Sequence, residues 1–434
     1  MHLNFELGPV INRIALKTNQ MVIKTKYVLK IVLLSLMIMN ISCQSNQKTK
    51  SDNTMESVEK GTYGYDLEFI KKHTKPVELK RSDARILISP EYQGRVMTSS
   101  ASGDTGMSYG WINHDLIGSG EVLKQFNPVG GEERFWLGPE GGQYSIFFKP
   151  GSSFDFEEWE TPACIDTEGF ELIAADDTSA EFSRSVQLTN YSNFEFIFDV
   201  NRKISLLTDS QIKNKLNAVF QDDVKRVGYE TVNQLTNTGS ENWTKETGLL
   251  SIWLLGMFNP SDEVTIVVPY KAKAESEYIV KDDYFGKIPS DRLVVKDGIV
   301  FFKGDGKQRG KIGIPPQRAL PVIGSYDAKN KVLTVLRCEV PEGVNDYVNS
   351  AWEMQEFPYK GDAINSYNDG PMEDGSQMGP FYELETSSPA LALKAGESAV
   401  YKQSTFHFEG TEEELNSLCQ QIFDITLNEI KSVF

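Results

Sequence analysis

The sequence predicts an all-β protein, a large antiparallel β-sandwich that is closed by a C-terminal helix. From residue 85 onward, short apolar segments recur, many of them alternating, and Gly, Asn, Asp or Pro stands in nearly every gap. Helical patterns are few, and no repeat period indicates a propeller or a solenoid. With 434 residues, 40% of them hydrophobic, the chain can bury a core of sandwich size.

The N-terminus carries an export signal. Lys24, Lys26 and Lys30 precede the apolar run Ile31–Met39, and Cys43 follows shortly after. A basic head, a short apolar stretch and a small residue before the cut are typical of a secretory signal, and the run is too short to span a membrane as a helix. A Cys directly after the cut resembles a lipoprotein signal, in which that Cys is acylated.

These features predict three parts. Residues 1–42 form the signal with an upstream extension, residues 43–60 form a flexible lipid-anchored tether, and residues 61–434 form the folded domain. We therefore expect a membrane-anchored lipoprotein of the cell envelope, in the periplasm or on the outer membrane. An uncleaved anchor or an ordinary signal is the alternative.

Charge and cysteine content exclude several classes of partner. The net charge of −17, with no basic stripe, opposes binding to nucleic acid. Besides Cys43, the three cysteines Cys164, Cys338 and Cys419 are widely spaced and give neither a disulfide framework nor a metal pattern. We expect them to be buried apolar side chains.

The predicted strands begin with Arg85–Ser89 and Arg95–Ser99, which flank a turn that contains Pro and Gly. Further strands are predicted at Ser145–Lys149, Ala180–Leu188, Phe194–Asn201, Arg226–Thr236, Leu250–Phe258, Glu263–Pro269, Ile299–Lys303, Val332–Cys338 and Val400–Phe408. A short helix is predicted near Tyr65–His73. A longer one, Thr411–Phe434, opens with a capping box and is expected to pack on the outside of the sandwich.

The Gly-rich segment Gly130–Gln143 is the first candidate site. Arg134, Trp136 and Glu140 offer a bidentate donor, a flat apolar surface and a carboxylate, which together suit a sugar with its apolar faces and hydroxyl groups. A Gly-rich hairpin whose Trp fills the core is the alternative.

The second candidate segment is Tyr347–Pro389, of which residues 347–374 have little strand pattern and predict a long loop. Long ordered loops are often functional. The candidate polar and aromatic side chains in it are Asn349, Trp352, Glu353, Asp362, Asn365, Tyr367, Asn368, Asp369, Glu383 and Glu385. Such acids and amides could bind sugar hydroxyls or a calcium ion, but without a regular ligand spacing we predict neither a metal site nor a cofactor. A solvated acidic loop is the alternative.

The segment Phe381-Tyr-Glu-Leu-Glu-Thr-Ser-Ser-Pro389, followed by Leu393-Lys-Ala-Gly-Glu397, resembles the end of the aldose 1-epimerases, or galactose mutarotases. The wider polar motifs resemble an uncharacterised family of mutarotase-like lipoproteins. The resemblance implies a large antiparallel β-sandwich and carbohydrate as the partner. It also implies that Glu385 is the base that takes the proton of the anomeric hydroxyl.

The sequence departs from mutarotases at the acid. Mutarotases protonate the ring oxygen with a His, and Trp253 stands near the place where that His would be. His407 lies in an alternating strand and is more typical of a structural His, whereas His114 could reach a site. The second proton handler is therefore sought among Glu140, Glu353, Asp369 and His114.

Three hypotheses remain open from the sequence. The first is an enzyme that acts on sugars with Glu385 as its base, in a hollow where the two candidate segments meet and Glu385 forms the floor. A pair of carboxylates would also suit the cleavage of a glycosidic bond. The second is a non-catalytic glycan-binding lipoprotein in which Trp136, Trp253 and Trp352 stack on sugar. The third is a structural protein of the envelope. Protein partners and the identity of the sugar are not predicted.

Overall fold

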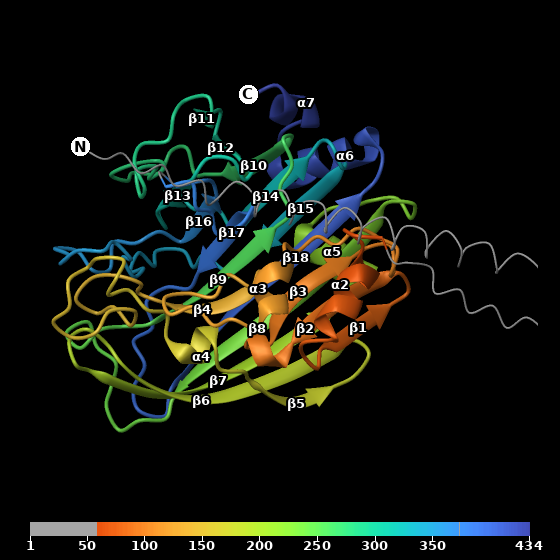
Figure 1. Ribbon diagram of the computed structural model, residues 1–434. Coiled ribbons are helices and arrows are strands. Elements are labelled where there is room, and N and C mark those ends of the chain that lie inside the picture. The colour runs from red at the N-terminus through yellow and green to blue at the C-terminus, as the bar shows by residue number, and fades with distance from the viewer. Residues whose placement is uncertain (1–58, 373) are drawn as a thin grey trace, which may run out of the picture. The chain divides into compact units, whose positions relative to one another are not determined.

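Figure 1 shows a computed structural model, which describes residues 59–372 and 374–434. The predicted signal, Cys43 and most of the predicted tether lie outside the described residues. No helix in the described part of the chain is both long enough and apolar enough to cross a membrane.

The described residues form eighteen strands in three sheets, and all of the strand pairs in them are antiparallel. The ten-stranded sheet has the order β11 (Leu293–Lys296), β12 (Ile299–Lys303), β10 (Val264–Pro269), β14 (Val322–Asp327), β15 (Val332–Arg337), β18 (Ser398–Glu409), β8 (Lys225–Asn237), β7 (Glu195–Leu206), β6 (Ser179–Thr189) and β5 (Glu171–Ala175). The five-stranded sheet has the order β13 (Gly310–Ile314), β16 (Ile364–Asn368), β17 (Tyr382–Ser387), β9 (Ser251–Phe258) and β4 (Arg134–Gly138). The third sheet contains β1 (Val77–Arg81), β2 (Ala84–Ser89) and β3 (Arg95–Ser100).

The predicted all-β sandwich is therefore confirmed, but its elements differ: eight strands of the structure, β1, β4, β5, β11, β13, β14, β16 and β17, were not expected from the sequence. Ser145–Lys149 is not a strand and contributes only an isolated bridge from Phe148 to Trp159. The predicted long loop contains the strand β16. Asn365 and Tyr367 lie on one face of this strand and Ile364 and Ser366 on the other, so both faces carry polar groups and the usual apolar–polar alternation of a strand is missing.

The described helices are short: α2 (Tyr63–Ile70), α3 (His114–Ser119), α4 (Ala163–Asp166), α5 (Asp209–Leu216), α6 (Glu412–Phe423) and α7 (Leu427–Lys431), besides a 3₁₀ turn at Pro90–Tyr92. The predicted C-terminal helix and its capping box at Thr411 and Glu414 are confirmed, but the helix ends at Phe423 instead of running to Phe434. Asp424 adopts a left-handed conformation with φ of 60°, which ends α6, and Thr426 caps a second helix.

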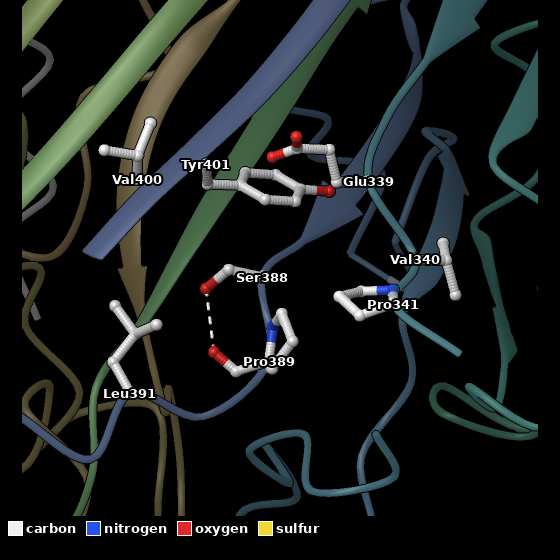
Figure 2. Close-up of a pocket in the computed structure, with 8 residues that line it drawn as sticks. All are labelled: Glu339, Val340, Pro341, Ser388, Pro389, Leu391, Val400 and Tyr401. Carbon is white, nitrogen blue, oxygen red and sulfur yellow. Dashed lines mark hydrogen bonds between the residues drawn. The ribbon is translucent and has the colours of Figure 1, made fainter. Parts of the chain in front are cut away.

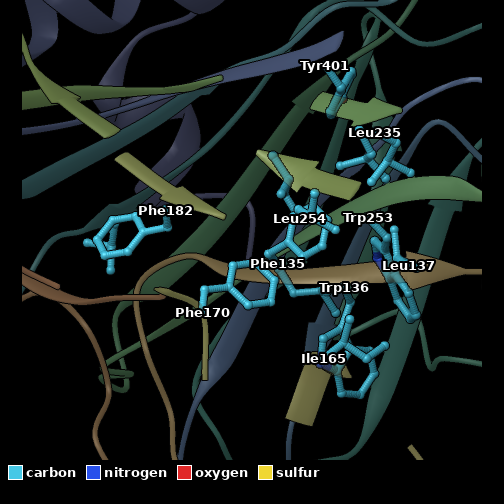
Figure 3. Packing of buried hydrophobic residues seen from close by; sticks show 14 of the residues in the cluster. Phe135, Trp136, Leu137, Ile165, Phe170, Phe182, Leu235, Trp253, Leu254 and Tyr401 are labelled. Carbon is cyan, nitrogen blue, oxygen red and sulfur yellow. The ribbon is translucent and has the colours of Figure 1, made fainter. Parts of the chain in front are cut away.

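Helix α6 buries Leu415, Leu418 and Phe423 in a cluster with strand residues such as Leu333 and Phe406 of the ten-stranded sheet. The largest core cluster joins both large sheets. Figure 3 shows part of it, with Phe135, Leu137 and Leu254 of the five-stranded sheet and Leu235 and Tyr401 of the ten-stranded sheet. Cys164 and Cys419 are buried, Cys338 is half-buried, and all three are free thiols.

A polar network crosses the core between the two large sheets. The Arg202 guanidinium on β7 lies 2.8 Å from Glu133, and both side chains have no exposed surface. Gln403 on β18 donates to the other oxygen of Glu133 over 2.7 Å and accepts from Thr386 on β17 over 2.6 Å. The network thus connects β7, β18, β17 and the residue before β4, which fixes the two sheets relative to each other.

His407 is a structural histidine of the core. One ring nitrogen lies 2.8 Å from Glu132 and the other 2.9 Å from Thr334, and the ring stacks on Tyr109. Its side chain is 1% exposed, so it is not available to a ligand.

We predict that Arg202→Met lowers the free energy of unfolding by about 3–5 kcal/mol, because it leaves the Glu133 charge buried without its cation. Urea unfolding followed by tryptophan fluorescence measures the change. The control is Lys203→Met, next in the chain, whose pair with Glu181 is half-exposed and contributes only about 0.2–1 kcal/mol. Equal losses in the two variants would contradict the role of the network.

Candidate functional site

One face of the five-stranded sheet carries ionisable and aromatic side chains where the other face carries core residues. Glu385 lies opposite Asn365 on one side and Leu255 on the other, and Leu255 in turn lies opposite Arg134. Because directly paired residues of antiparallel strands point to the same face, these side chains share one surface. We call this surface the ionisable face; its members include Arg134, Trp136, Trp253, Lys311, Asn365, Glu383 and Glu385.

Glu385 is held by two donors on this face. Its Oε2 accepts a hydrogen bond from the Lys311 ammonium over 2.9 Å and another from the Trp253 indole over 3.0 Å. Burial alone would lower the pKa of Lys311, but the carboxylates of Glu385 and Glu140 outweigh it, and the pKa rises. Oε1 of Glu385 is buried without a hydrogen-bond partner among the described residues, so one carboxylate oxygen is left to accept a proton or a hydroxyl.

Arg134 and Glu383 form the second charged pair, with 3.0 Å between Nη2 and Oε1. The guanidinium lies over the Trp136 ring at 4.1 Å. Burial lowers the pKa of Arg134 and raises the pKa of Glu383 to about 7, against the opposing effect of their attraction. Glu383 therefore loses much of its charge near neutral pH.

Glu140 follows β4 and is the carboxyl group with the other raised pKa. Burial raises its pKa to about 7, and the Glu385 charge adds to the rise while Lys311, Trp352 and Arg134 oppose it. At and below neutral pH a large fraction of Glu140 is protonated, so it can donate a proton.

The two candidate segments meet at Glu140. The backbone N–H of Glu140 donates to the Ser350 hydroxyl over 3.2 Å, and two hydrogen bonds of 3.0 Å join Gln143 to Gln355. A Cβ on Gly141 would lie only 2.3 Å from the Ala351 carbonyl, so the close approach requires glycine. The predicted meeting of the segments is present in the structure.

The connection between β10 and β11 lies against the same face. Lys281 pairs with Gly313 of the edge strand β13 through two backbone hydrogen bonds. Both Tyr278 and Tyr284 donate to Asp362, and Asn365 donates to the Tyr284 hydroxyl over 3.4 Å. Burial raises the pKa of Asp362. Tyr284 therefore lies beside Asn365, the cross-strand neighbour of Glu385.

Five of the other predicted site residues lie away from Glu385 and Glu140. His114, on α3, contacts Asp66 at 2.7 Å and packs between Tyr65 and Phe69. Glu353 is exposed, and the Asn349 side chain accepts from the backbone of Ala351 within its own loop.

Asn368 points to the opposite face of β16, where it donates to Gln308 and Asp305, because it lies an odd number of residues from Asn365. The Asp369 carboxylate accepts a hydrogen bond from the Tyr367 hydroxyl over 2.7 Å and lies at the end of the ionisable face that carries Glu383. The residues that the structure does bring together with Glu385 are Arg134, Trp136, Glu140, Trp253, Trp352 and Asn365.

The expected open hollow with Glu385 at its floor is not observed. Glu385 has no exposed surface and Glu383 is 6% exposed. Trp352 is half-buried and stacks on Trp159, a tryptophan that the sequence analysis did not select. A ligand reaches Glu385 only after a covering side chain moves. No group of three or more His, Cys, Asp and Glu suited to a metal occurs in residues 59–372 and 374–434.

Residues missed from the sequence are Lys311 and Tyr284, whereas Glu383 and Asp362 belong to the second candidate segment, where no role of their own was predicted for them. Lys311 carries a local signal, since it is the only charged residue of the strand Gly310–Ile314, and Glu383 shares the Glu-Leu-Glu alternation with Glu385. Tyr284 has no such signal, because its role depends on a contact across the fold.

Most of the chain matches one known protein family. Residues 61–434 match the model of a family described as "Family of unknown function (DUF6786)". No curated protein matches the chain.

The fold is similar to three solved structures of low sequence identity. The first is a provisionally assigned aldose 1-epimerase from Escherichia coli K12, with 11% identity and a TM-score of 0.47, and the match covers 77% of this chain and 98% of that chain. The second is a galactose mutarotase-like protein from Lactobacillus casei ATCC 334, with 12% identity and a TM-score of 0.45, and the match covers 77% of this chain and 100% of that chain. The third is a galactose mutarotase related enzyme from Lactobacillus acidophilus, with 11% identity and a TM-score of 0.42, and the match covers 78% of this chain and 99% of that chain.

We predict that Glu140→Gln changes how stability depends on pH. In the unfolded chain a Glu titrates near pH 4.3, but in the folded protein Glu140 titrates at about 7. Between these values the folded state binds the extra proton, so the free energy of unfolding falls as pH rises. The variant lacks this fall. The difference in free energy of unfolding, variant minus native protein, should therefore increase as the pH is raised from about 4.5 to about 8.

Urea unfolding at a series of pH values measures this difference. The titration of Glu383 contributes equally to the pH dependence of both proteins and cancels in the difference. Glu353→Gln, at an exposed carboxylate on the facing loop, serves as the control and should give a flat difference. A flat difference for Glu140→Gln as well would show that Glu140 titrates like an exposed carboxyl.

Proposed function

The chain belongs to the family of unknown function DUF6786, and for this member we propose that the ionisable face binds an aldose and exchanges its anomers, with Glu385 as the base and Glu140 as the acid. The observation that carries the proposal is the pairing of two unlike carboxyl groups around Lys311. One is bound by a cation, and the other has a pKa raised to about 7. Groups whose environments separate their proton affinities are suited to acid–base chemistry.

The proposed reaction needs one proton transfer at each end of the broken bond. Oε1 of Glu385 takes the proton of the anomeric hydroxyl, the bond from the anomeric carbon to the ring oxygen breaks, and Glu140 gives its proton to that oxygen. Rotation about the bond to the aldehyde carbon and the reverse transfers close the ring as the other anomer. Trp253 cannot replace the missing His, because an indole N–H donates hydrogen bonds but does not ionise near neutral pH.

Lys311 and Trp253 fix the orientation of the Glu385 carboxylate through its Oε2, which leaves Oε1 to the substrate. Trp352 is the partly exposed aromatic side chain beside Glu140 and is proposed to stack on the sugar. Trp136 is 4% exposed and its ring is covered by Arg134, so its role is to position that cation. Access requires that the 271–289 connection or the 350–357 loop moves.

Glycan binding without turnover is the second candidate function. It is favoured by the complete burial of Glu385 and by its bond to Lys311, since a buried, paired carboxylate can be structural. In this case the loops around Trp352 bind the sugar and the charged pairs only support them.

We predict that freshly dissolved aldoses equilibrate faster in the presence of the protein and that Glu385→Gln slows this by about 10²–10⁴-fold, the usual contribution of a general base. Polarimetry or proton NMR of the anomers measures the rate. Glu140→Gln should lower the rate and remove its decline above about pH 7, because that decline follows the loss of the Glu140 proton.

Glu353→Gln is the matched control and should leave the rate unchanged. If Glu385→Gln retains the rate of the native protein, Glu385 is not the base. If no aldose is accelerated but glycans still bind, the second candidate function holds.

We further propose that the protein is exported and anchored to the cell envelope by acylation of Cys43, on the strength of the signal-like residues before it. Cells grown with labelled palmitate should incorporate label into the native protein and not into Cys43→Ser. Cys164→Ser, at another free cysteine, is the control and should retain the label. Equal labelling of the native protein and Cys43→Ser would exclude Cys43 as the acylated residue.

A further inference from the structure

A hollow of about 480 Å³ lies where the ends of strands from both large sheets meet, separate from the acid–base pair (Figure 2). Residues 388–391, which follow β17, line one side of it, and residues 339–341, which follow β15, line another. Val400 and Tyr401 of β18 complete the lining. The volume is within the range of sites for small organic molecules.

The walls of the hollow are held by hydrogen bonds to the sheets. The Ser388 backbone N–H donates to the Ile252 carbonyl over 2.8 Å, and the Ser388 hydroxyl accepts from the Ile252 N–H over 2.9 Å. On the other side, Oε2 of Glu339 accepts from the Lys402 backbone N–H over 3.1 Å. The shape therefore exists before a ligand enters, which lowers the entropic cost of binding.

Most of the lining is apolar and comes from Val340, Pro341, Pro389, Leu391 and Val400. Two polar groups remain available. The Tyr401 hydroxyl is buried and has no hydrogen-bond partner of good geometry in the described part of the chain, and Tyr401 as a whole is 2% exposed. Glu339 is exposed and has its Oε1 uncommitted. The Ser388 hydroxyl is already used, since it also donates to the Pro389 carbonyl over 2.9 Å.

This combination selects for the charge of a ligand. The hollow offers a carboxylate, a phenolic oxygen and an aromatic ring, and no cationic side chain lines it. Two of these groups favour a cation, since the carboxylate accepts charge-assisted hydrogen bonds from it and the ring attracts it electrostatically, and the phenolic oxygen can accept a further N–H. A net charge of −17 attracts small cations further. A sugar would need more hydrogen-bonding groups than the two that are free.

We propose that this hollow binds a small organic ammonium ion, with its apolar body against the proline, leucine and valine side chains and its N–H groups donated to Glu339 and to the oxygen of Tyr401. Figure 2 shows the Tyr401 ring between Glu339 on one side and Ser388 and Pro389 on the other. The ligand site is independent of the proposed sugar chemistry and does not require it.

Cyclohexylammonium is the probe that tests the proposal, and cyclohexanol is its uncharged counterpart with the same ring. In methyl NMR titrations of the full chain, the ammonium should shift the Leu391 and Val400 signals and bind about fivefold more tightly than the alcohol. Glu339→Gln should reduce the affinity to about that of the alcohol. Tyr401→Phe, which removes one unpartnered oxygen and preserves packing, should weaken binding by a few-fold.

Glu342→Gln is the control, because it removes an exposed carboxylate three residues away that does not line the hollow. It should leave the affinity unchanged. If Glu339→Gln binds the ammonium as tightly as the native protein, or if the alcohol binds equally well, the assignment to ammonium ions is wrong. If neither probe shifts the methyl signals of Leu391 or Val400 at millimolar concentrations, the hollow is not a ligand site.

Discussion

The Arg202–Glu133 ion pair fixes the geometry on which the rest of the site depends. Glu133 precedes Arg134 directly, and Thr386, at the other end of the same network, follows Glu385 directly. Neighbouring residues of a strand point to opposite faces of the sheet. The network that holds Glu133 and Thr386 between the two large sheets therefore also sets the positions of Arg134 and Glu385 on the ionisable face. The inner network therefore holds Arg134 and Glu385 in register across two strands of the five-stranded sheet.

Burial then decides which carboxyl groups keep their charge. Glu385 and Glu383 each have a cation within hydrogen-bonding distance, whereas Glu140 has none bonded to it among the described residues. Desolvation disfavours every anion on this face, and at Glu383 even the bonded Arg134 does not offset it, so the pKa values of Glu383 and Glu140 both rise to about 7. The result is two carboxyl groups of raised pKa beside the Lys311–Glu385 ion pair, produced by sheet position and loop cover.

Much of the fold could be predicted from the sequence, because alternation and turn residues are local. Ten of the eleven strands proposed from the sequence correspond to strands of the structure, while β16 was hidden by polar residues on both faces and the C-terminal helix ends early at Asp424. For the site, the Leu-Glu-Thr motif selected Glu385, and the Gly-rich segment selected Arg134 and Glu140. Lys311 and Tyr284 could not be selected, since cross-strand register and loop contacts are properties of the folded chain.

The close contact at Gly141 has a consequence for Glu140. The loop that carries Trp352 lies against the backbone at Gly141 because no side chain intervenes, and this contact keeps water from the neighbouring carboxyl group. The proton affinity of an acidic residue thus depends on the missing methyl group of the residue after it. In such an arrangement, evolution can retune an acid without replacing it, by changing how tightly two loops close over it.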